Sequence, residues 1–161
     1  TTNQSDIFEY HSEPINAKNV PENLKGLRTM FLSFHHFQPK NAKMILQNAI
    51  NSNQPIAVLE IQDRSLPSIV AMLLSPVSVL FTTPFIRPFR WSRLFFTYLI
   101  PIVPFVVLWD GIVSALRTYT VEEMRNLINS LENNTAFEWN FNKKKSKTGF
   151  VIYTIGIPKK Q

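Results

Sequence analysis

Two short apolar runs constrain the fold of this chain more than any other feature. The first, residues 27–34, is bounded by Gly26 and by the adjacent His35 and His36. The second, residues 56–61, is almost continuously apolar. Each run is short, rich in apolar residues and bounded by turn residues, and therefore predicts a strand that is buried on both faces.

A helical pattern separates the two runs. Pro39 suits the first position of a helix, because its missing N–H would have no partner there, and the helix is expected to end near Asn53. Strand, helix and strand in this order predict two parallel strands with a right-handed crossover. Apolar residues at three- and four-residue spacing predict the buried helix face: Ala42, Ile45, Leu46, Ala49 and Ile50.

The C-terminal third predicts a helix followed by an antiparallel hairpin. Thr120 and Glu123 have the spacing of a capping box, in which each side chain accepts a hydrogen bond from a free backbone N–H of the first turn. Residues 136–141 and 150–157 then predict two strands joined by a basic turn. The apolar face of the predicted helix comprises Val121, Met124, Leu127, Ile128 and Leu131.

An apolar insertion at about 66–110 lies between these two parts. Its only charges before Asp110 are Arg87, Arg90 and Arg93. A crossing helix needs about 20 mostly apolar residues, and frequent prolines interrupt this segment. We expect a lid over the sheet that handles greasy substrates and touches a membrane; the alternative is a pair of segments that dip into a bilayer. The prolines are Pro67, Pro76, Pro84, Pro88, Pro101 and Pro104.

Composition narrows the class of protein. The 161 residues are enough for one domain, and 45% hydrophobic with 17% charged residues excludes disorder for most of the chain. The net charge of +6 comes partly from lysines of the predicted hairpin turn, which favours a solvated turn over a nucleic-acid site. The absence of cysteine excludes disulfides and thiolate metal sites and fits a cytoplasmic protein. The turn lysines are Lys143, Lys144, Lys145 and Lys147.

The order of these elements, with His35, His36 and Phe37 following the first strand, resembles the C-terminal half of the class I S-adenosylmethionine-dependent methyltransferases. The resemblance implies a partial Rossmann-like α/β fold, in which the two apolar runs are the fourth and fifth strands and the hairpin is the sixth and seventh. It covers most of the chain. The sequence begins at Thr1 rather than methionine, which predicts a piece of a longer protein.

The resemblance also implies S-adenosylmethionine as the cofactor. Asn16 and Ala17 stand where that family often has an acidic adenine-recognition turn, and Ser33 and Phe34 are the other cofactor-binding candidates. The family's glycine-rich turn after its first strand has no counterpart here, so we expect the chain alone to bind the cofactor weakly or not at all. The glycines are scattered: Gly26, Gly111, Gly149 and Gly156.

In the family's sheet the fourth strand lies beside the first. Without that neighbour, the edge at 27–34 would carry unpaired backbone groups that invite another strand. The resemblance therefore predicts pairing at this edge with a second copy, giving a homodimer, or with the rest of the domain.

His35 and His36 are the catalytic candidates, because ligands of open α/β sheets bind outside the carboxyl ends of the strands. One imidazole would act as a general base on an acceptor hydroxyl. The favoured structural alternative is that one histidine caps the following helix and the other packs against it. His11 is expected at the surface.

The candidate acceptor-binding residues are Glu60, Asp63, Arg64, Trp109 and Asp110. The first three either orient the acceptor or form a solvated ion pair. A carboxylate at Asp110, in its apolar context, needs a partner or water, and Arg117 is the expected partner.

We interpret the full-length protein as an S-adenosylmethionine-dependent methyltransferase of a small hydrophobic or lipid-like acceptor. The acceptor class rests on the apolar insertion. The alternative is a non-catalytic membrane-associated or assembly module that retains the fold, which the missing glycine-rich turn favours.

Overall fold

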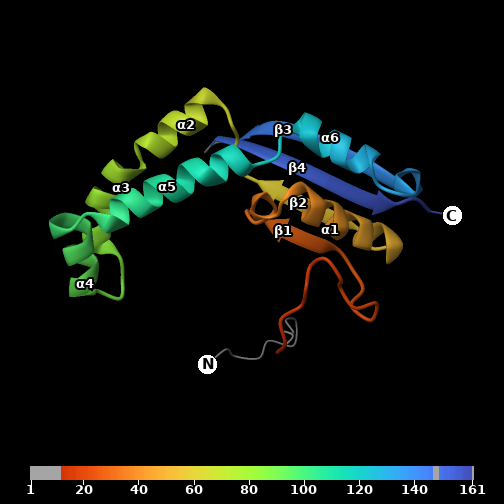
Figure 1. Cartoon of the computed structure of the whole chain (residues 1–161), viewed down its shortest axis with the longest axis horizontal. Coiled ribbons are helices and arrows are strands. Elements are labelled where there is room, and N and C mark those ends of the chain that lie inside the picture. Colours follow the sequence, from red (N-terminus) through yellow and green to blue (C-terminus); the bar gives the residue numbers. More distant parts are fainter. Residues whose placement is uncertain (1–11, 147–148, 161) are drawn as a thin grey trace.

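The computed structural model describes residues 12–146 and 149–160 as a mixed α/β structure (Figure 1). Its described strands form a four-stranded sheet in the order β1-β2-β4-β3. The predicted extended segment around Ile7, Phe8 and Tyr10 lies outside the described residues, as do His11 and Lys147.

The predicted crossover unit is confirmed. Strand β1 (Arg28–Phe31) leads through a short 3₁₀ turn, η1 (Phe34–His36), into helix α1 (Pro39–Asn51), and β2 (Ile56–Glu60) follows. Strands β1 and β2 are parallel, with Arg28 opposite Ile56. Helix α1 buries the five apolar residues that its periodicity indicated.

The first apolar run forms a shorter and more exposed strand than predicted. Strand β1 ends at Phe31, and Leu32 adopts a positive φ of 50°, which turns the chain into η1. The strand is also not buried on both faces, because it lies at the edge of the described sheet and Phe31 is 62% exposed. Only the face that carries Met30 packs against the core.

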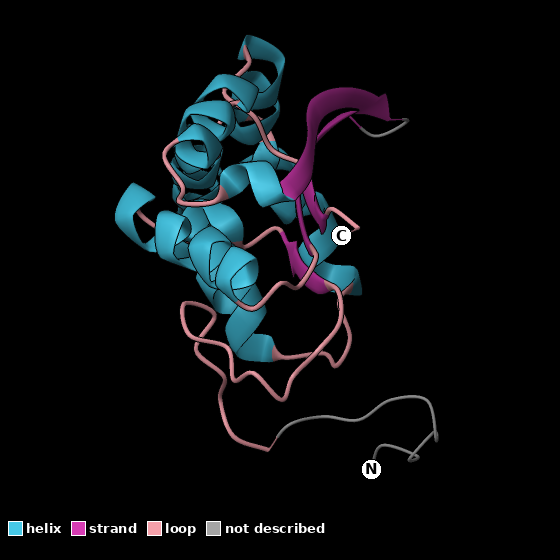
Figure 2. Ribbon diagram, turned by 90° about the vertical axis from the view of Figure 1, so that its right-hand side faces the viewer, coloured by secondary structure: helices cyan, strands magenta, loops and turns pink. Residues whose placement is uncertain are grey.

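The C-terminal elements follow the prediction closely. Helix α6 (Val121–Asn129) begins with the expected capping box: Thr120 Oγ1 accepts the Glu123 N–H at 3.1 Å, and Glu123 Oε2 accepts the Thr120 N–H at 2.9 Å. Strands β3 (Phe137–Ser146) and β4 (Gly149–Pro158) form the antiparallel hairpin, whose far end curls away from the rest of the sheet in Figure 2. Strand β4 pairs antiparallel with β2.

Three lysines placed in a turn by the sequence lie in a strand instead. Lys143, Lys144 and Lys145 extend β3 opposite Ile152, Val151 and Phe150. The hairpin is therefore longer than its apolar segments indicated, because backbone pairing with β4 continues through all three lysines.

Helices α1 and α6 share one core with the sheet. Ile56 and Val58 of β2 meet both helices, and Phe137 of β3 completes the cluster. The helix residues buried there are Ala42, Ile45, Leu46, Ala49, Ile50, Met124 and Ile128, with Leu131 just beyond α6.

The apolar insertion forms a helical arm, residues 66–117, that extends away from the sheet (Figure 1). It therefore does not form the predicted lid, and its two ends lie near the sheet: residues 67–72 beside Leu32, Ile61 and Phe150, and residues 116–117 beside the two histidines. Prolines stand at the starts of its helices, as their missing N–H groups allow. The elements are α2 (Leu66–Leu73), α3 (Ser75–Thr82), η2 (Thr83–Phe85), α4 (Trp91–Leu94), the π-helical η3 (Phe95–Leu99) and α5 (Ile102–Arg117).

Candidate functional site

The carboxyl ends of the parallel strands β1 and β2 meet at one edge of the sheet. η1, which carries both histidines, follows β1 after the turn at Leu32, and Glu60 is the last residue of β2. The sheet thus brings His35 and Glu60 together across 25 residues of sequence.

Glu60 is buried and accepts three hydrogen bonds from η1. Its Oε1 accepts the backbone N–H of Phe34 at 2.8 Å and that of His35 at 3.2 Å. Its Oε2 lies 2.9 Å from His35 Nδ1. The carboxylate therefore satisfies the first donors of η1 and fixes the imidazole in the same contact.

This contact selects one tautomer of His35. An ionised carboxylate only accepts hydrogen bonds, so Nδ1 must carry the proton that it shares with Glu60. In the neutral ring Nε2 is then the free acceptor. The His36 ring contacts the His35 ring at a tilt, with centroids 4.2 Å apart, but His36 is exposed and has no such carboxylate partner among the described residues.

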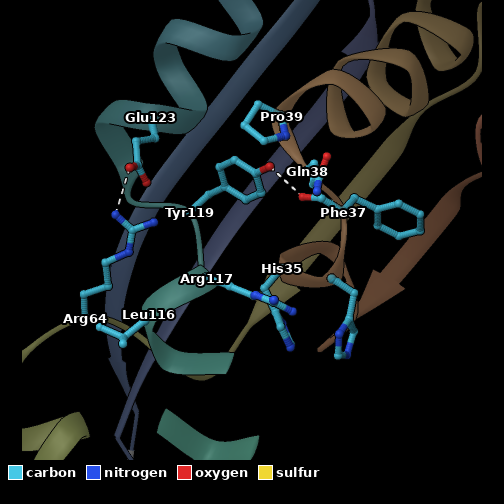
Figure 3. Close-up of a pocket in the computed structure, with 10 residues that line it drawn as sticks. His35, Phe37, Gln38, Pro39, Arg64, Leu116, Arg117, Tyr119 and Glu123 are labelled. Atoms are coloured by element: carbon cyan, nitrogen blue, oxygen red, sulfur yellow. Dashed lines mark hydrogen bonds and ion pairs between the residues drawn. The ribbon is translucent and has the colours of Figure 1, made fainter. Parts of the chain in front are cut away.

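A cavity of about 360 Å³ lies beside the two histidines (Figure 3). Both histidines line it, together with the start of α1 and the end of the arm helix α5. Its wall combines polar and apolar surface in about equal parts and carries two arginines. The lining residues are His35, His36, Phe37, Gln38, Pro39, Arg64, Leu116, Arg117, Tyr119 and Glu123.

Hydrogen bonds hold the far wall of the cavity in place. The Tyr119 hydroxyl donates to the Phe37 carbonyl at 2.7 Å, and Arg64 Nη1 donates to Glu123 Oε1 at 2.8 Å (Figure 3). Burial raises the pKa of Tyr119, so its hydroxyl remains a donor. Burial disfavours the Glu123 carboxylate, but hydrogen bonds from the Thr120 backbone and Arg64 outweigh it and lower the pKa of Glu123.

Asp63 belongs to a neighbouring cluster rather than to the cavity wall. Its Oδ1 accepts the Ser65 hydroxyl at 2.5 Å and the Ser65 N–H at 3.1 Å, and Lys143 of β3 forms an ion pair with it. Burial opposes the charged form of Asp63, yet Lys143 and Ser65 bind it strongly enough to hold its pKa well below the usual range.

The predicted acceptor group of Glu60, Asp63 and Arg64 is therefore divided among separate partners. Glu60 bonds to His35 beneath the cavity, and Asp63 forms an ion pair with Lys143. Of the three residues, only Arg64 lines the cavity. The interpretation as one solvated ion pair is also wrong, because Glu60 and Asp63 are 4% and 3% exposed.

Two further expectations are corrected. Neither histidine caps α1, because its N-cap residue is Gln38 and both imidazoles belong to η1. Asp110 forms no ion pair with Arg117 in the described structure: the two residues are seven apart on α5, about two helical turns. Trp109 and Asp110 lie out on the arm beside a shallow apolar groove with Ile102 and Phe105, and do not line the cavity.

The candidate cofactor residues form two sequence-adjacent pairs, Asn16-Ala17 in a loop and Ser33-Phe34 at η1. Asn16 is exposed and its Oδ1 accepts the Lys18 N–H at 3.0 Å, while Ala17 packs on the edge of the core. Ser33 precedes η1, and the Phe34 ring is buried against Tyr119 at 5.5 Å between centroids. Their role in binding a cofactor stays a prediction.

The sequence analysis did not predict three of the residues that line the cavity: Gln38, Tyr119 and Arg117. Arg117 ends the arm and Tyr119 follows it just before the capping box, so their distance from the histidines in sequence concealed them. In residues 12–146 and 149–160, no group of three His, Cys, Asp or Glu side chains could hold a metal ion.

Comparison with protein-family models, curated proteins and solved structures gave no match.

Proposed function

We propose that these residues are the closing part of a Rossmann-like methyltransferase domain, and that the full-length protein transfers a methyl group from S-adenosylmethionine to an acceptor in the His35 cavity. The observation that carries the proposal is the buried His35–Glu60 pair at the carboxyl ends of the parallel strands, beneath a cavity. Acceptor sites of open α/β sheets lie at this edge.

The order of elements supports the fold part of the proposal. A parallel pair joined by a helix is followed by the insertion, a capped helix and an antiparallel hairpin. This is the order on which the resemblance to the methyltransferases rests. Asn16 is exposed, however, and no glycine-rich turn is present, so the described residues do not by themselves form a cofactor site.

His35 would hold the proton that the acceptor gives up. Bound S-adenosylmethionine supplies an electrophilic methyl group, and an acceptor hydroxyl loses its proton as it becomes methylated. Because Nδ1 is held by Glu60, Nε2 is the atom that takes this proton, and the resulting imidazolium is stabilised by the carboxylate.

The cavity wall supports an amphipathic acceptor. Gln38 and the arginines Arg64 and Arg117 offer hydrogen bonds to a polar head, and Leu116 connects this wall to the apolar surface of α5. A lipid-like molecule would place its head at His35 and its tail along the arm.

Labelled-methyl transfer by the full-length protein tests the proposal. A panel of apolar hydroxyl, amine and acid compounds would be incubated with methyl-labelled S-adenosylmethionine and the products analysed. His35→Asn should lower the rate about a hundredfold or more, whereas His36→Asn should lower it less. Absence of transfer to every compound, or equal rates for both variants, would contradict it.

The exposed apolar arm favours a second candidate, a non-catalytic membrane-associated module that retains the fold. Calorimetric titration of the full-length protein with S-adenosylmethionine distinguishes the two. Binding supports the enzyme, and its absence supports the module.

The edge of β1 opposite β2 has no neighbouring strand among the described residues, and this edge completes the proposal. The N–H groups of Arg28 and Leu32 bond to carbonyls of Pro55 and Leu59, so those of Thr29 and Phe31 point away from β2. We propose that a strand from a second copy, or from the rest of the domain, pairs there.

A further inference from the structure

The arm has the reverse of the residue distribution found in soluble helix pairs. Helices α2 and α3 bury no residue, and the buried residues of the arm are small or polar: Thr83, Thr97, Pro104, Ser114 and Ala115. A helix pair in water places its large apolar residues between the helices and its polar residues outside. Here the large apolar side chains face outward.

A glycine brings α5 close to α2. Gly111 of α5 lies so close to Met72 of α2 that an added Cβ would come within 2.8 Å of the Met72 sulfur. Small residues that permit close helix contact are typical of helix pairs in lipid, where apolar burial between helices gives no driving force.

Hydroxyl groups of the arm bond within the arm. Thr82, Thr83 and Thr97 donate to backbone carbonyls four residues earlier, at 2.7 to 2.8 Å. The Tyr98 hydroxyl donates to the Leu80 carbonyl. These bonds satisfy four hydroxyl donors inside the arm, as a hydrocarbon environment demands, whereas the buried Ser75 hydroxyl has no partner among the described residues.

Apolar residues are exposed on the outer sides of both long helical segments of the arm, residues 66–85 and α5. They recur at three- and four-residue spacing, so each segment carries a stripe that faces away from its partner helix. A single docked protein face would cover one side only. The exposed residues are Leu66, Val70, Leu73, Leu74, Val77, Leu80, Phe81 and Phe85 on the segment 66–85, and Ile102, Phe105, Val106, Val107, Trp109 and Leu116 on α5.

The dimensions and charges of the arm match a bilayer. Leu66–Phe85 is one 20-residue helical segment that is long and apolar enough to cross a membrane, and at 1.5 Å per residue it spans about 30 Å, the thickness of the hydrocarbon layer. Trp91–Leu99 and Ile102–Arg117 meet that test together but are bent by 78°. The charges that follow Phe85 at the tip are Arg87, Arg90 and Arg93.

We propose that the arm inserts into a bilayer that contains anionic lipids. The outer stripes contact acyl chains, and the tip arginines bind headgroup phosphates. Asp110, the acidic residue of the arm, lies near the middle of α5, seven residues or about 10 Å along the helix from Arg117. This inference does not depend on methyl transfer and stands or falls separately.

Vesicle flotation of the whole chain tests the insertion. Vesicles of phosphatidylcholine with phosphatidylglycerol should carry the protein upward in a density gradient. Phe81→Asp, at a side chain 74% exposed, should lower partitioning about a hundredfold, the factor expected for aspartate at the centre of an inserted helix. Phe31→Asp, at an exposed phenylalanine of β1, is the matched control and should float as the wild type does.

The tryptophans report which part is in lipid. Trp91 and Trp109 lie on the arm and Trp139 lies on β3, so single-tryptophan variants separate the two regions. Lipids brominated on the acyl chains should quench Trp109 strongly and leave Trp139 unchanged. Equal quenching of both would overturn the proposal.

The tip arginines give the charge dependence. Arg87→Gln with Arg90→Gln should weaken binding to anionic vesicles about 25-fold, and binding to neutral vesicles much less. A chain that stays at the bottom of the gradient with both vesicle types overturns the proposal. So does a lipid-free oligomer that Phe81→Asp dissociates, because it shows that protein covers the arm.

Discussion

His35 Nδ1 lies 2.9 Å from Glu60 Oε2, with 5% and 6% of the two side chains exposed. This contact joins the turn after β1 to the last residue of β2. It places an oriented imidazole under a cavity, and a buried carboxylate without such partners would be strongly destabilising.

Glu60→Gln should change the tautomer of His35. The glutamine carbonyl can still accept the two backbone N–H groups, but its amide then faces Nδ1 as a donor, so the ring proton must move to Nε2. Long-range ¹⁵N–¹H spectra of the imidazole measure this directly. Stability should fall by about 1–2 kcal/mol, whereas Glu122→Gln on the exposed face of α6 should change neither.

Asp63→Asn should flatten the acid limb of the stability curve. The pKa of Asp63 is lowered in the folded chain, so its contribution is present above the unfolded value of about 4 and is lost as the pH falls toward the folded value. Denaturant unfolding at pH 7 and pH 3 should show that the free energy of unfolding falls more for the wild type than for Asp63→Asn. At pH 7 the variant should be about 2 kcal/mol less stable. An equal fall in the free energy of unfolding between pH 7 and pH 3 for the variant, the wild type and the control Glu138→Gln would refute this account.

Thr120→Ala should destabilise the protein by about 1 kcal/mol, because it removes the acceptor for the Glu123 N–H at the start of α6. Thermal unfolding followed by circular dichroism measures the shift. Thr135→Ala, at an exposed residue outside the helix caps, should leave the unfolding temperature within error.

Gly156→Ala should be costly despite its small size. Trp139 of β3 is paired with Gly156 of β4, and its ring lies over the glycine. An added Cβ would come within 2.4 Å of that ring. Overpacking of this kind costs about 1–3 kcal/mol, measurable by urea unfolding. Ile157→Ala, at a neighbouring exposed position, should cost less; the reverse order would show that Trp139 moves freely.

Thr29→Pro should prevent strand addition at β1. It removes an N–H that points away from β2 and keeps the β1–β2 hydrogen bonds. Sedimentation velocity in detergent should detect a dimer of the wild type and of Thr29→Ala, and a monomer of the proline variant. A wild type that is monomeric at every concentration would rule out a second copy at this edge.

The arm shows where periodicity is an incomplete guide. The uncharged, proline-marked sequence identified an insertion, but Pro67 and Pro76 fall in the first turns of α2 and α3 and leave a nearly continuous rod. The expectation of a lid was wrong because the direction in which a segment leaves the sheet is not encoded in its apolar pattern.

The sequence by itself determined the local elements. Spacing of apolar residues predicted α1 and the buried face of α6, and the Thr120–Glu123 pair predicted the cap, because these features depend on neighbours within a few residues. Only the tertiary structure decided that β1 ends at Phe31, that Glu60 serves His35 and that Asp63 serves Lys143. Those pairings join residues far apart in the chain, and burial in the folded sheet selects among several partners that are chemically equivalent in the sequence.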